Sequence, residues 1–411
     1  MLSVNYTKRR TPKYILKIIS ISIGFSFAFL ILELIARSFP ATKHFSLQDQ
    51  FECNWVDIKS KISERCIFKF YPNRKGRYTK GKIPPFPIDV IKETNDIGQF
   101  SSVDFKDLIN KDSKSSFKIL SIGDSYVEAL QVNNDESFHG ILNSLSTLDG
   151  KRVISSSIGK GGDAFSQYLL NLQYVSQRTN IDNLTIVIPV ISNDFENSIF
   201  GYRTNIPGAY FEAKEGETYK FKYINYNRKL PSKVFNTILS HSSLSSYLYH
   251  HLNFSIILNK RPLCFLTNKE CLYKRKNLFK ANIIDSSIRE TPERYRDGFL
   301  ATDIFLENIA KLRPSKKERG NTLFVIDGDR FSIYKGATYK SKYFLAQRNY
   351  FIEQAKIYGF TLIDMEQIFK EHYRINNKKF EFINDGHWNS LGHKLVSNTV
   401  AKELRLKIKN N

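Results

Sequence analysis

The sequence predicts an α/β fold: a three-layer α/β/α sandwich around a mostly parallel five-stranded sheet. From residue 115 onward, short runs rich in β-branched residues alternate with helical stretches, as they do in proteins built on a parallel sheet. The runs are apolar almost throughout, as expected for strands that are covered on both faces. With 411 residues and 41% apolar side chains, the chain is also large enough to bury a full core.

The chain begins with a basic tail and an apolar stretch. Residues 1–13 carry four basic side chains, and residues 14–36 follow with an uncharged centre from Ile18 to Leu32. The apolar stretch is long enough to span a bilayer. The positive charges before it place the amino terminus in the cytoplasm and the rest of the chain outside. We therefore predict a transmembrane anchor. A cleaved signal peptide is the alternative, although residues 35–41 offer no good small-x-small cleavage site.

Two regions surround or interrupt the predicted sheet. Residues 37–113 are turn-rich, and we expect this preamble to pack on the following domain, residues 114–411. An insertion at about 200–300 separates the third predicted strand from the fourth, and it includes a predicted hairpin, Ala209–Tyr226, and a predicted helical patch, Leu239–Asn253. Long insertions in α/β folds often shape access of the substrate. A flap that does not contact the substrate is the alternative.

The four cysteines fall into two close pairs, Cys53 with Cys66 and Cys264 with Cys271. The predicted location outside the cytoplasm permits disulfides, so we predict one bridge within each pair. Neither pair has histidine or cysteine neighbours at the spacing of a zinc site. No metal site is therefore predicted.

Five strands and five main helices are predicted after the preamble. The strands are Lys118–Ile122, Arg152–Ser156, Leu184–Val190, Thr322–Ile326 and Phe360–Ile363. The helices are Ser137–Leu148, Ala164–Thr179, Asp303–Leu312, Phe344–Tyr358 and Ser390–Leu406. In an open parallel sheet of this kind, the ligand crevice lies at the carboxyl ends of the strands.

The chain is strongly basic, with 62 Lys and Arg residues against 40 Asp and Glu residues and a net charge of +22. Nucleic-acid binding is one interpretation of such an excess. However, the basic residues are spread over the whole length, no nucleic-acid-binding motif is present, and the anchor argues against a cytosolic site. We therefore predict no nucleic-acid partner. Contact with acidic glycans or an anionic membrane surface fits better, and a composition biased towards Lys, Asn and Ile is the alternative.

The first strand leads into Gly123-Asp124-Ser125. A serine in this position lies at the carboxyl end of a strand and at the amino end of a helix. Its hydroxyl and its N–H can both face the crevice, and the helix end favours negative charge nearby. Ser125 is therefore a candidate nucleophile, with a helix N-cap as its alternative, structural role.

Three further segments bring polar groups to the same region. The glycine-rich segment Ser157–Asp163 follows the second strand and lets backbone N–H groups approach a ligand. Asn193 follows the third strand and offers an amide donor to a developing oxyanion. Asp385 lies two residues before His387, in a predicted tight loop, where a carboxylate orients an imidazole as general base. Each segment also has a structural interpretation as an ordinary loop or turn.

Taken together, these four blocks resemble the SGNH (GDSL-type) hydrolase superfamily, which is named for Ser, Gly, Asn and His in four such segments. The resemblance covers roughly residues 115 to 408. The stretch Ile122–Val132 is similar to the first block of membrane-tethered bacterial members, and Tyr71–Asn73 and Thr94–Gly98 resemble segments that precede the domain in such proteins. The resemblance implies a flavodoxin-like sheet.

The resemblance also implies roles for individual residues. Ser125 matches the nucleophile, His387 the base and Asp385 its orienting acid. The oxyanion hole is expected to comprise the N–H of Ser125, the N–H of Gly161 and the side chain of Asn193.

Two positions depart from the family pattern. The commonest spacing places the acid three residues before the histidine, where Asn384 stands in this chain. Some polysaccharide-acetylating relatives have Asp-x-His instead, which supports Asp385. In the glycine block, Lys160 stands where the family glycine falls, between Gly159 and Gly161. We assign the donor to Gly161. If Lys160 takes the place of the family glycine, the resemblance implies that the oxyanion hole is rebuilt or impaired.

The resemblance implies a serine esterase that acts through an acyl-enzyme on acyl esters, above all O-acetyl esters, of cell-envelope or exported polysaccharide. It implies no cofactor and no metal. An O-acyltransferase on the same glycans uses the same residues and is the first alternative. A catalytically inactive, glycan-binding envelope scaffold is the second. The expected partners are an acylated glycan or other ester and the membrane. The expected location is the cell inner membrane, with the catalytic domain on the periplasmic side.

Overall fold

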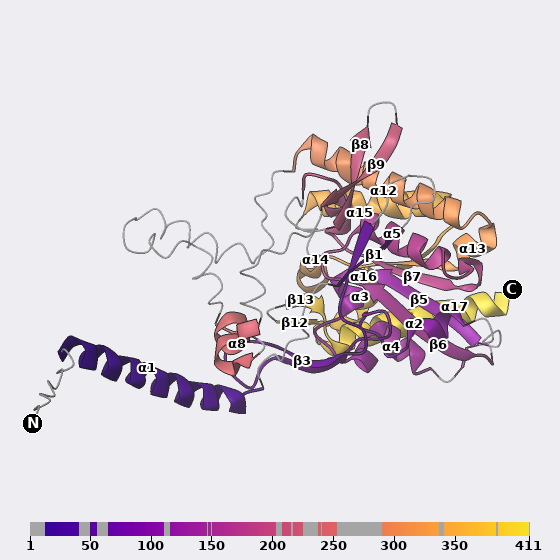
Figure 1. Cartoon of the computed structure of the whole chain (residues 1–411). Coiled ribbons are helices and arrows are strands. Elements are labelled where there is room, and N and C mark those ends of the chain that lie inside the picture. Colours follow the sequence, from indigo (N-terminus) through magenta and orange to yellow (C-terminus); the bar gives the residue numbers. More distant parts are fainter. Residues whose placement is uncertain are drawn as a thin grey trace, which may run out of the picture.

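The computed structural model of the protein describes residues 13–40, 50–55, 65–110, 116–145, 147–148, 150–202, 208–214, 217–224, 237–239, 241–252, 290–336, 341–383 and 385–410. Several residues discussed above lie outside these ranges: three of the four basic residues of the amino-terminal tail (Lys8, Arg9 and Arg10), the cysteines Cys264 and Cys271, and Asn384. In the described part, an α/β domain carries a long amino-terminal helix that extends away from it (Figure 1).

The central sheet has five parallel strands in the spatial order β11, β10, β7, β5, β6. Numbered along the chain from the other edge, this order is 2-1-3-4-5, that of flavodoxin-type sheets, whose ligand crevice lies where the first and third strands meet. The strands are β5 (Ser116–Gly123), β6 (Arg152–Gly159), β7 (Thr185–Val190), β10 (Thr322–Ile326) and β11 (Thr361–Asp364). The predicted fold class is therefore confirmed.

Helices cover both faces of this sheet (Figure 1). Residues of α2, α5, α12 and α15 pack with one hydrophobic cluster, and residues of α4, α16 and α17 pack with the other. The helices of the domain are α2 (Phe105–Ile109), α3 (Ser125–Glu128), α4 (Phe138–Asn143), α5 (Phe165–Ser176), α6 (Asp194–Asn197), α12 (Pro292–Leu312), α13 (Lys316–Gly320), α14 (Arg330–Lys335), α15 (Lys342–Ile357), α16 (Met365–Asn376) and α17 (Ser390–Asn410), with 3-10 turns at Asn134–Glu136 and Ile181–Asn183.

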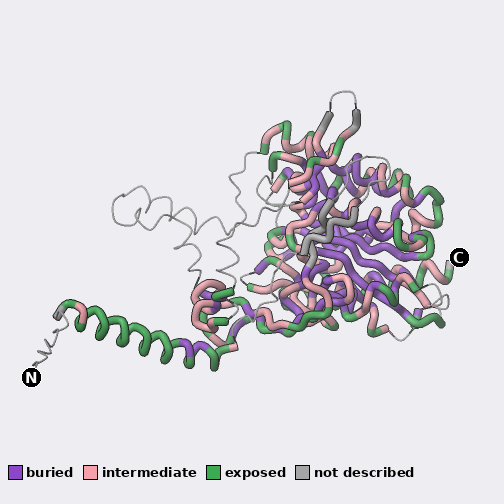
Figure 2. The backbone as a smooth tube through the Cα atoms, viewed as in Figure 1, coloured by how far each residue is buried: buried purple, intermediate pink, exposed green. Residues whose placement is uncertain are grey.

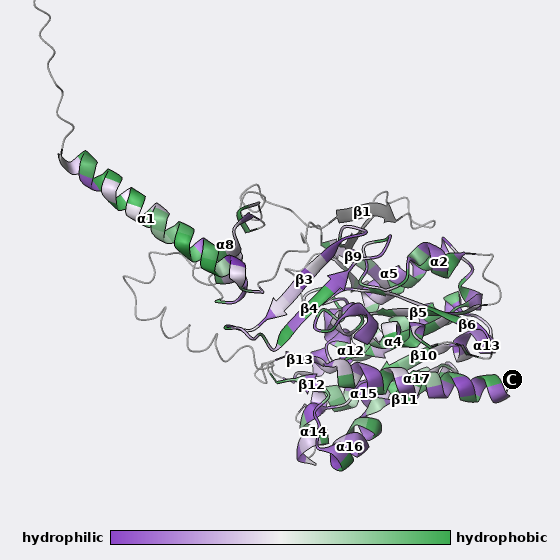
Figure 3. Ribbon diagram, turned by 90° about the horizontal axis from the view of Figure 1, so that it is seen from below, coloured by the Kyte–Doolittle hydropathy of each residue, from purple (hydrophilic) through white to green (hydrophobic). Residues whose placement is uncertain are grey.

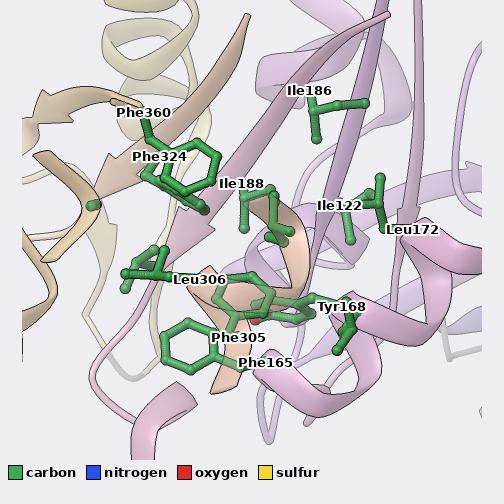
Figure 4. Close-up of a cluster of buried hydrophobic side chains, with 14 of the residues drawn as sticks. Ile122, Phe165, Tyr168, Leu172, Ile186, Ile188, Phe305, Leu306, Phe324 and Phe360 are labelled. Carbon is green, nitrogen blue, oxygen red and sulfur yellow. The ribbon is translucent and has the colours of Figure 1, made fainter. Parts of the chain in front are cut away.

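Alternate strand residues supply two separate cores, because successive side chains of a strand point to opposite faces. In β7, Ile186 and Ile188 belong to one cluster, whereas Val187 belongs to the other. The first cluster is rich in aromatic rings, and Phe305 stacks on Phe165 with ring centroids 4.5 Å apart (Figure 4). The sheet is accordingly the buried centre of the molecule (Figure 2).

Helix α4 is shorter than predicted, and its end has a local cause. It stops at Asn143, whereas the prediction extended it to Leu148. The backbone groups of Leu148 pair with those of Lys151 in a tight turn. Gly150 lies inside this turn with φ of +67°, a conformation that glycine adopts without strain.

Helix α12 is longer than predicted at its amino end. It begins at Pro292, where the Thr291 side chain caps the first turn, whereas the prediction began it at Asp303. Proline is favoured at the first helical position because its missing N–H would have no intrahelical acceptor there. The Thr-Pro-Glu sequence at 291–293 was therefore a usable helix-start signal.

The preamble contributes two antiparallel hairpins and α2. The strands are β1 (Gln50–Trp55) with β2 (Arg65–Lys69), and β3 (Lys75–Lys80) with β4 (Ile88–Glu93). Cys53 and Cys66 lie on β1 and β2, where the register of this pair is irregular, and a bridge between them stays a prediction. Phe105 and Leu108 of α2 join the first core of the α/β domain.

The insertion is described in part. Its hairpin consists of β8 (Gly208–Lys214) and β9 (Glu217–Ile224), close to the predicted range. Phe211 on β8 is fully buried in the first core, so this hairpin packs on the domain. Helix α8 (Ser243–His250) lies beside the carboxyl end of the long amino-terminal helix, α1 (Figure 1).

Helix α1 (Lys13–Ser38) is long and apolar enough to span a membrane. Its hydrophobic side chains are almost all exposed (Figures 2 and 3), whereas the core helices of a soluble domain bury theirs. Only Glu33 and Ala36, both near its carboxyl end, are buried.

We expect Phe305→Ala to lower the free energy of unfolding by about 3–5 kcal/mol, because it removes a large side chain from a packed core and leaves a cavity. Phe305 is 0% exposed. Urea unfolding of the detergent-solubilised full chain measures the change. Phe331→Ala is the control, since that ring is 43% exposed, and its effect should stay within about 0.5 kcal/mol. Equal stability of the two variants would contradict the described packing.

Candidate active site

Ser125 is the first residue of α3, directly after β5. The carboxylate of Asp124 caps this helix by accepting the N–H of Tyr126 at 2.9 Å. An N–H in the first turn of a helix has no intrahelical acceptor, so the Ser125 N–H points out of the helix end. Strand β7, which precedes Asn193, pairs with β5. Ser125 and Asn193 therefore follow the two neighbouring strands at which the chain order of the sheet reverses.

Ser125, His387 and Asp385 are in direct contact. The Ser125 Oγ lies 2.7 Å from the His387 Nε2. The His387 Nδ1 is hydrogen-bonded to the Asp385 Oδ1, and the backbone N–H of His387 donates to the same oxygen at 3.1 Å. The structure thus brings together the predicted nucleophile, base and orienting acid, although Ser125 is far from the other two in the sequence.

Asp385 and His387 lie on a strand and not in the predicted tight loop. This strand, β13 (Asp385–Trp388), pairs with β12 (Glu381–Phe382) in an antiparallel ladder. Residues two apart on a strand point to the same face. The Asp-x-His spacing therefore places the carboxylate beside the imidazole without any special loop conformation.

Both oxygens of the Asp385 carboxylate accept hydrogen bonds. Its second oxygen, Oδ2, accepts from the Lys80 Nζ at 2.6 Å and from the Gln131 Nε2 at 3.4 Å. Burial disfavours the charged form, but the His387 hydrogen bond and the charge of Lys80 outweigh it and hold the pKa of Asp385 well below its usual range. Asp385 is therefore a fixed negative charge that orients the imidazole.

Tyr126 joins the helix that begins with Ser125 to the strand that carries His387. Its hydroxyl donates to the backbone oxygen of Gly386 at 2.9 Å. Its ring packs edge-on against Trp388, with centroids 4.7 Å apart, and lies 5.1 Å from the His387 ring. Because Tyr126 follows Ser125 directly, these contacts restrict the distance between Ser125 and His387.

The backbone N–H groups of the glycine block have acceptors within the protein. The N–H of Gly159 donates to the Gln99 side chain at 3.0 Å, and the N–H of Lys160 donates to the Gly123 oxygen at 3.3 Å. The N–H of Gly161, the predicted oxyanion donor, donates to Glu128 at 2.8 Å. A substrate oxyanion has to replace that carboxylate before Gly161 can bind it.

Gly161 nevertheless lies beside the nucleophile. A Cβ added there would come within 3.7 Å of the Ser125 Cβ and within 2.7 Å of the Glu128 carboxylate. The second distance is too short for any larger residue unless Glu128 moves. Glycine at this position therefore allows Glu128 to approach closely, and the role of Gly161 in an oxyanion hole stays a prediction.

Glu128 is a site residue that sequence reasoning missed. It lies three residues after Ser125 on α3 and is only 5% exposed. Burial raises the pKa of its carboxyl to about 7, against the opposing effects of the Lys160 charge and the Gly161 N–H. The (i, i+3) spacing from the nucleophile was the available signal, but nothing in the sequence distinguished it from an exposed helix charge.

Asp194, the residue after Asn193, anchors the segment that follows β7. The Asp194 carboxylate is buried, and it accepts the N–H of Ile191 at 2.7 Å and the Tyr168 hydroxyl at 2.8 Å. Burial raises the pKa of Asp194 well above its usual range. The Asn193 side chain is half-buried and does not cap α6. Its predicted contact with an oxyanion stays a prediction.

The preamble supplies polar contacts to these segments. Lys80 pairs with Asp385, and Gln99 accepts the Gly159 N–H. Lys92 is fully buried, and its Nζ donates to the Ala129 oxygen at 2.9 Å. Ala129 ends α3 with φ of +49°, so Lys92 stabilises the turn that closes the nucleophile helix. Burial lowers the pKa of Lys92 to about 7.

Comparison with known proteins finds only distant similarity. No protein-family model and no curated protein matches the sequence. The chain is similar to a solved structure of LAE5, an alpha/beta hydrolase enzyme from the metagenome of Lake Arreo, Spain, at 11% identity and a TM-score of 0.36, over 70% of this chain and 94% of that one. A second solved structure has 13% identity and a TM-score of 0.34, over 72% and 98%. Similarities this weak do not bear on the activity of this chain.

We expect Glu128→Gln to change the pH dependence of stability. Burial raises the pKa of Glu128 from 4.5 to about 7. In the pH window between these two values, the folded state keeps a proton that the unfolded chain releases. The stability of the wild type therefore falls as the pH rises through this window, and glutamine removes that fall. Relative to wild type, the free energy of unfolding of the variant should rise by about 2–3 kcal/mol between about pH 5 and pH 8.

Urea unfolding at the two pH values measures this gain. Glu371→Gln is the control, because that side chain is 57% exposed on α16, and its effect should differ by less than about 0.5 kcal/mol between the two pH values. A Glu128→Gln effect that is the same at both pH values would show that Glu128 ionises freely in the folded protein.

Proposed function

We propose that the protein is a serine-type acyl-ester hydrolase with Ser125 as nucleophile, His387 as general base and Asp385 as orienting acid. One observation supports this above all: the Ser125 Oγ lies 2.7 Å from the His387 Nε2, while the other ring nitrogen is hydrogen-bonded to Asp385. An imidazole in this arrangement can remove the serine proton, and the carboxylate stabilises the imidazolium that forms.

The reaction proceeds in two acyl-transfer steps. In the first, the Ser125 proton moves to the His387 Nε2 while the Oγ forms a bond to the ester carbonyl carbon. The C–O bond to the leaving alcohol then breaks, and the Nε2 proton passes to that alcohol. In the second, water loses a proton to His387 and attacks the acyl-enzyme, which releases the acid and restores Ser125. A sugar hydroxyl in the place of water makes the same site an O-acyltransferase.

The developing oxyanion needs hydrogen-bond donors at the amino end of α3. We assign this role to the Ser125 N–H and the Asn193 amide, with the Gly161 N–H joining when it leaves Glu128. Each such donor is worth about 3–4 kcal/mol of barrier. The Glu128–Gly161 hydrogen bond at 2.8 Å is also the observation that favours the second candidate function, a catalytically inactive glycan-binding scaffold.

We further propose that the domain is exported and anchored by α1, and that its substrates are acyl esters, above all O-acetyl esters, of cell-envelope or exported polysaccharide. The length and apolar composition of α1 support the anchor. The basic residues before α1 support an orientation with the domain on the periplasmic side of the inner membrane. The resemblance of the four sequence blocks to polysaccharide-acting members of the SGNH superfamily supports the substrate class.

We expect Ser125→Ala to lower the turnover of a short-chain ester by at least about a thousandfold, because it removes the nucleophile. The same variant should lose labelling by a fluorophosphonate probe. Ser144→Ala, which changes an exposed serine at the end of α4, is the control and should keep both. Wild-type turnover in Ser125→Ala would refute the nucleophile, and a wild type that is neither active nor labelled would favour the scaffold.

We expect Lys80→Met to lower kcat/KM by about tenfold, because Asp385 loses a charged hydrogen-bond partner. Lys75→Met is the matched control: Lys75 lies on the same strand, and its partner is Glu93, so this variant should keep the wild-type kcat/KM. A Lys80→Met kcat/KM equal to that of the wild type would exclude Lys80 from the site.

A further inference from the structure

Glu33 is a buried carboxylate near the end of the apolar helix α1. Its side chain is 9% exposed, although the apolar residues around it are exposed. It accepts hydrogen bonds from the Ser242 hydroxyl at 2.9 Å, from the Ser243 N–H at 3.0 Å and from the Leu244 N–H at 2.9 Å. These donors form the amino end of α8, so Glu33 fastens α8 to α1.

The position of Glu33 along α1 sets the depth of α8 in the membrane. A bilayer core needs about 20 helical residues, and α1 has 26, of which Glu33 is the sixth from the carboxyl end. Glu33 therefore lies where the outer end of the span meets the headgroups. An ionisable residue at this depth needs polar partners. Arg37 on α1 supplies one, at 3.0 Å, and the amino end of α8 supplies the other three. Tyr247 and Tyr249 on α8 suit this interface, where tyrosine is enriched in membrane proteins.

Helix α8 also holds the segment that follows β3. The Tyr247 hydroxyl donates to the Lys82 backbone oxygen at 2.5 Å. The His251 Nδ1 lies 2.8 Å from the Gly81 oxygen, and the His251 ring stacks on Phe86 with centroids 4.4 Å apart. Residues 81–87 are thus clamped against α8.

The clamped segment leads directly to the candidate active site. Lys80, the last residue of β3, donates to Asp385 at 2.6 Å. A continuous series of contacts therefore joins Glu33 of the apolar helix to the carboxylate that orients His387. Figures 1 and 3 show the same arrangement, with β12 and β13 at the edge of the domain nearest α8 and α1.

Large apolar side chains are exposed along this same edge. Ile83, on the clamped segment, is 74% exposed, and Leu252, just after α8, is 45% exposed. Ile383, two residues before Asp385, is 94% exposed. When apolar groups of this size, next to a membrane-spanning helix, enter the headgroup region, the free energy falls because apolar surface leaves water.

We propose that α8 and residues 81–87 form a membrane-surface platform that rests on the outer leaflet and holds the active-site edge against it. The occupant of this surface is the lipid bilayer itself. It follows that the acyl ester is presented to Ser125 at the bilayer surface, as an ester carried on a membrane-bound molecule. This second part rests on the proposed esterase function, whereas the docking of the platform does not.

The location of the platform can be measured without an activity assay. Ile83→Trp is reconstituted as full chain in vesicles of brominated phosphatidylcholine, which quenches tryptophan, and in unbrominated vesicles. The emission of the wild type, which has two tryptophans, is subtracted. Ile357→Trp is the control, since Ile357 is similarly exposed, at 71%, on α15. The added emission should be quenched for Ile83→Trp and not for Ile357→Trp. Equal emission from Ile83→Trp in both vesicles overturns the platform.

The tether is tested by adding Glu33→Leu to Ile83→Trp. Leucine preserves the apolar span but removes the acceptor of the three hydrogen bonds to α8. We expect the bromine quenching at position 83 to fall to the level of the Ile357→Trp control. Undiminished quenching overturns the role of Glu33 as the tether.

The substrate class is tested by the ratio of two turnover rates: that of an acyl ester on a lipid in vesicles, and that of the same acyl group on a water-soluble alcohol. Ile83→Asp should lower this ratio by about tenfold, because a charge replaces a membrane-facing apolar group, while the soluble ester is turned over as by wild type. Ile357→Asp should leave the ratio unchanged. An unchanged ratio in Ile83→Asp overturns surface presentation. A wild type that cleaves neither ester refutes the esterase proposal, and the quenching still reports on the platform.

Discussion

The hydrogen bond between the Ser125 Oγ and the His387 Nε2 joins residues 262 positions apart, and the chemistry of the site depends on it. Proton transfer tolerates little displacement of the two atoms, so both must be held by rigid structure. Strand β5, buried between neighbours in the sheet, sets the position of Ser125. On the other side, Trp388 is fully buried in the second core and fixes the strand that carries His387. The second hydrophobic core therefore has a direct consequence for the site, because it contains Val127, two residues after Ser125, as well as Trp388, directly after His387.

The preamble is part of this arrangement as well. The Lys80 Nζ donates a hydrogen bond to the second carboxylate oxygen of Asp385, and the Lys92 Nζ donates one to the Ala129 backbone oxygen at the end of α3. A fully buried ammonium such as that of Lys92 is costly unless its hydrogen bonds are satisfied, so this lysine and the turn it contacts stabilise each other. Residues 81–87 connect β3, which carries Lys80, to β4, which carries Lys92. They contact α8 and, through it, Glu33 of α1. The amino-terminal region thus links the apolar helix to the edge of the α/β domain that carries the candidate active site.

Much of the fold was predictable because it depends on local patterns. The five apolar runs became the five strands of the sheet, and α1 appeared where the long apolar stretch lies. Predictions were less accurate where backbone pairing across a turn, or a contact with a distant residue, decides the local structure. The Asp385–His387 segment reads as an Asp-Gly turn, yet it pairs with β12 as a strand. Helix α4 stops early because Leu148 pairs with Lys151 across a turn. Glu128 could not be recognised, because its partner Gly161 lies 33 positions away in the chain.

The sequence by itself determined the α/β class, the strand segments, the apolar helix and the choice of Ser125, Asp385 and His387 as candidate catalytic residues. Periodicity, charge placement and short motifs carry that information within a few residues of each feature. Only the tertiary structure decided the state of the groups around these residues: the Gly161 N–H is bound to Glu128, Asp385 is paired with Lys80, and Glu33 holds α8. These contacts join residues that are distant in the chain and that the packing of separate elements brings together, so no local pattern encodes them.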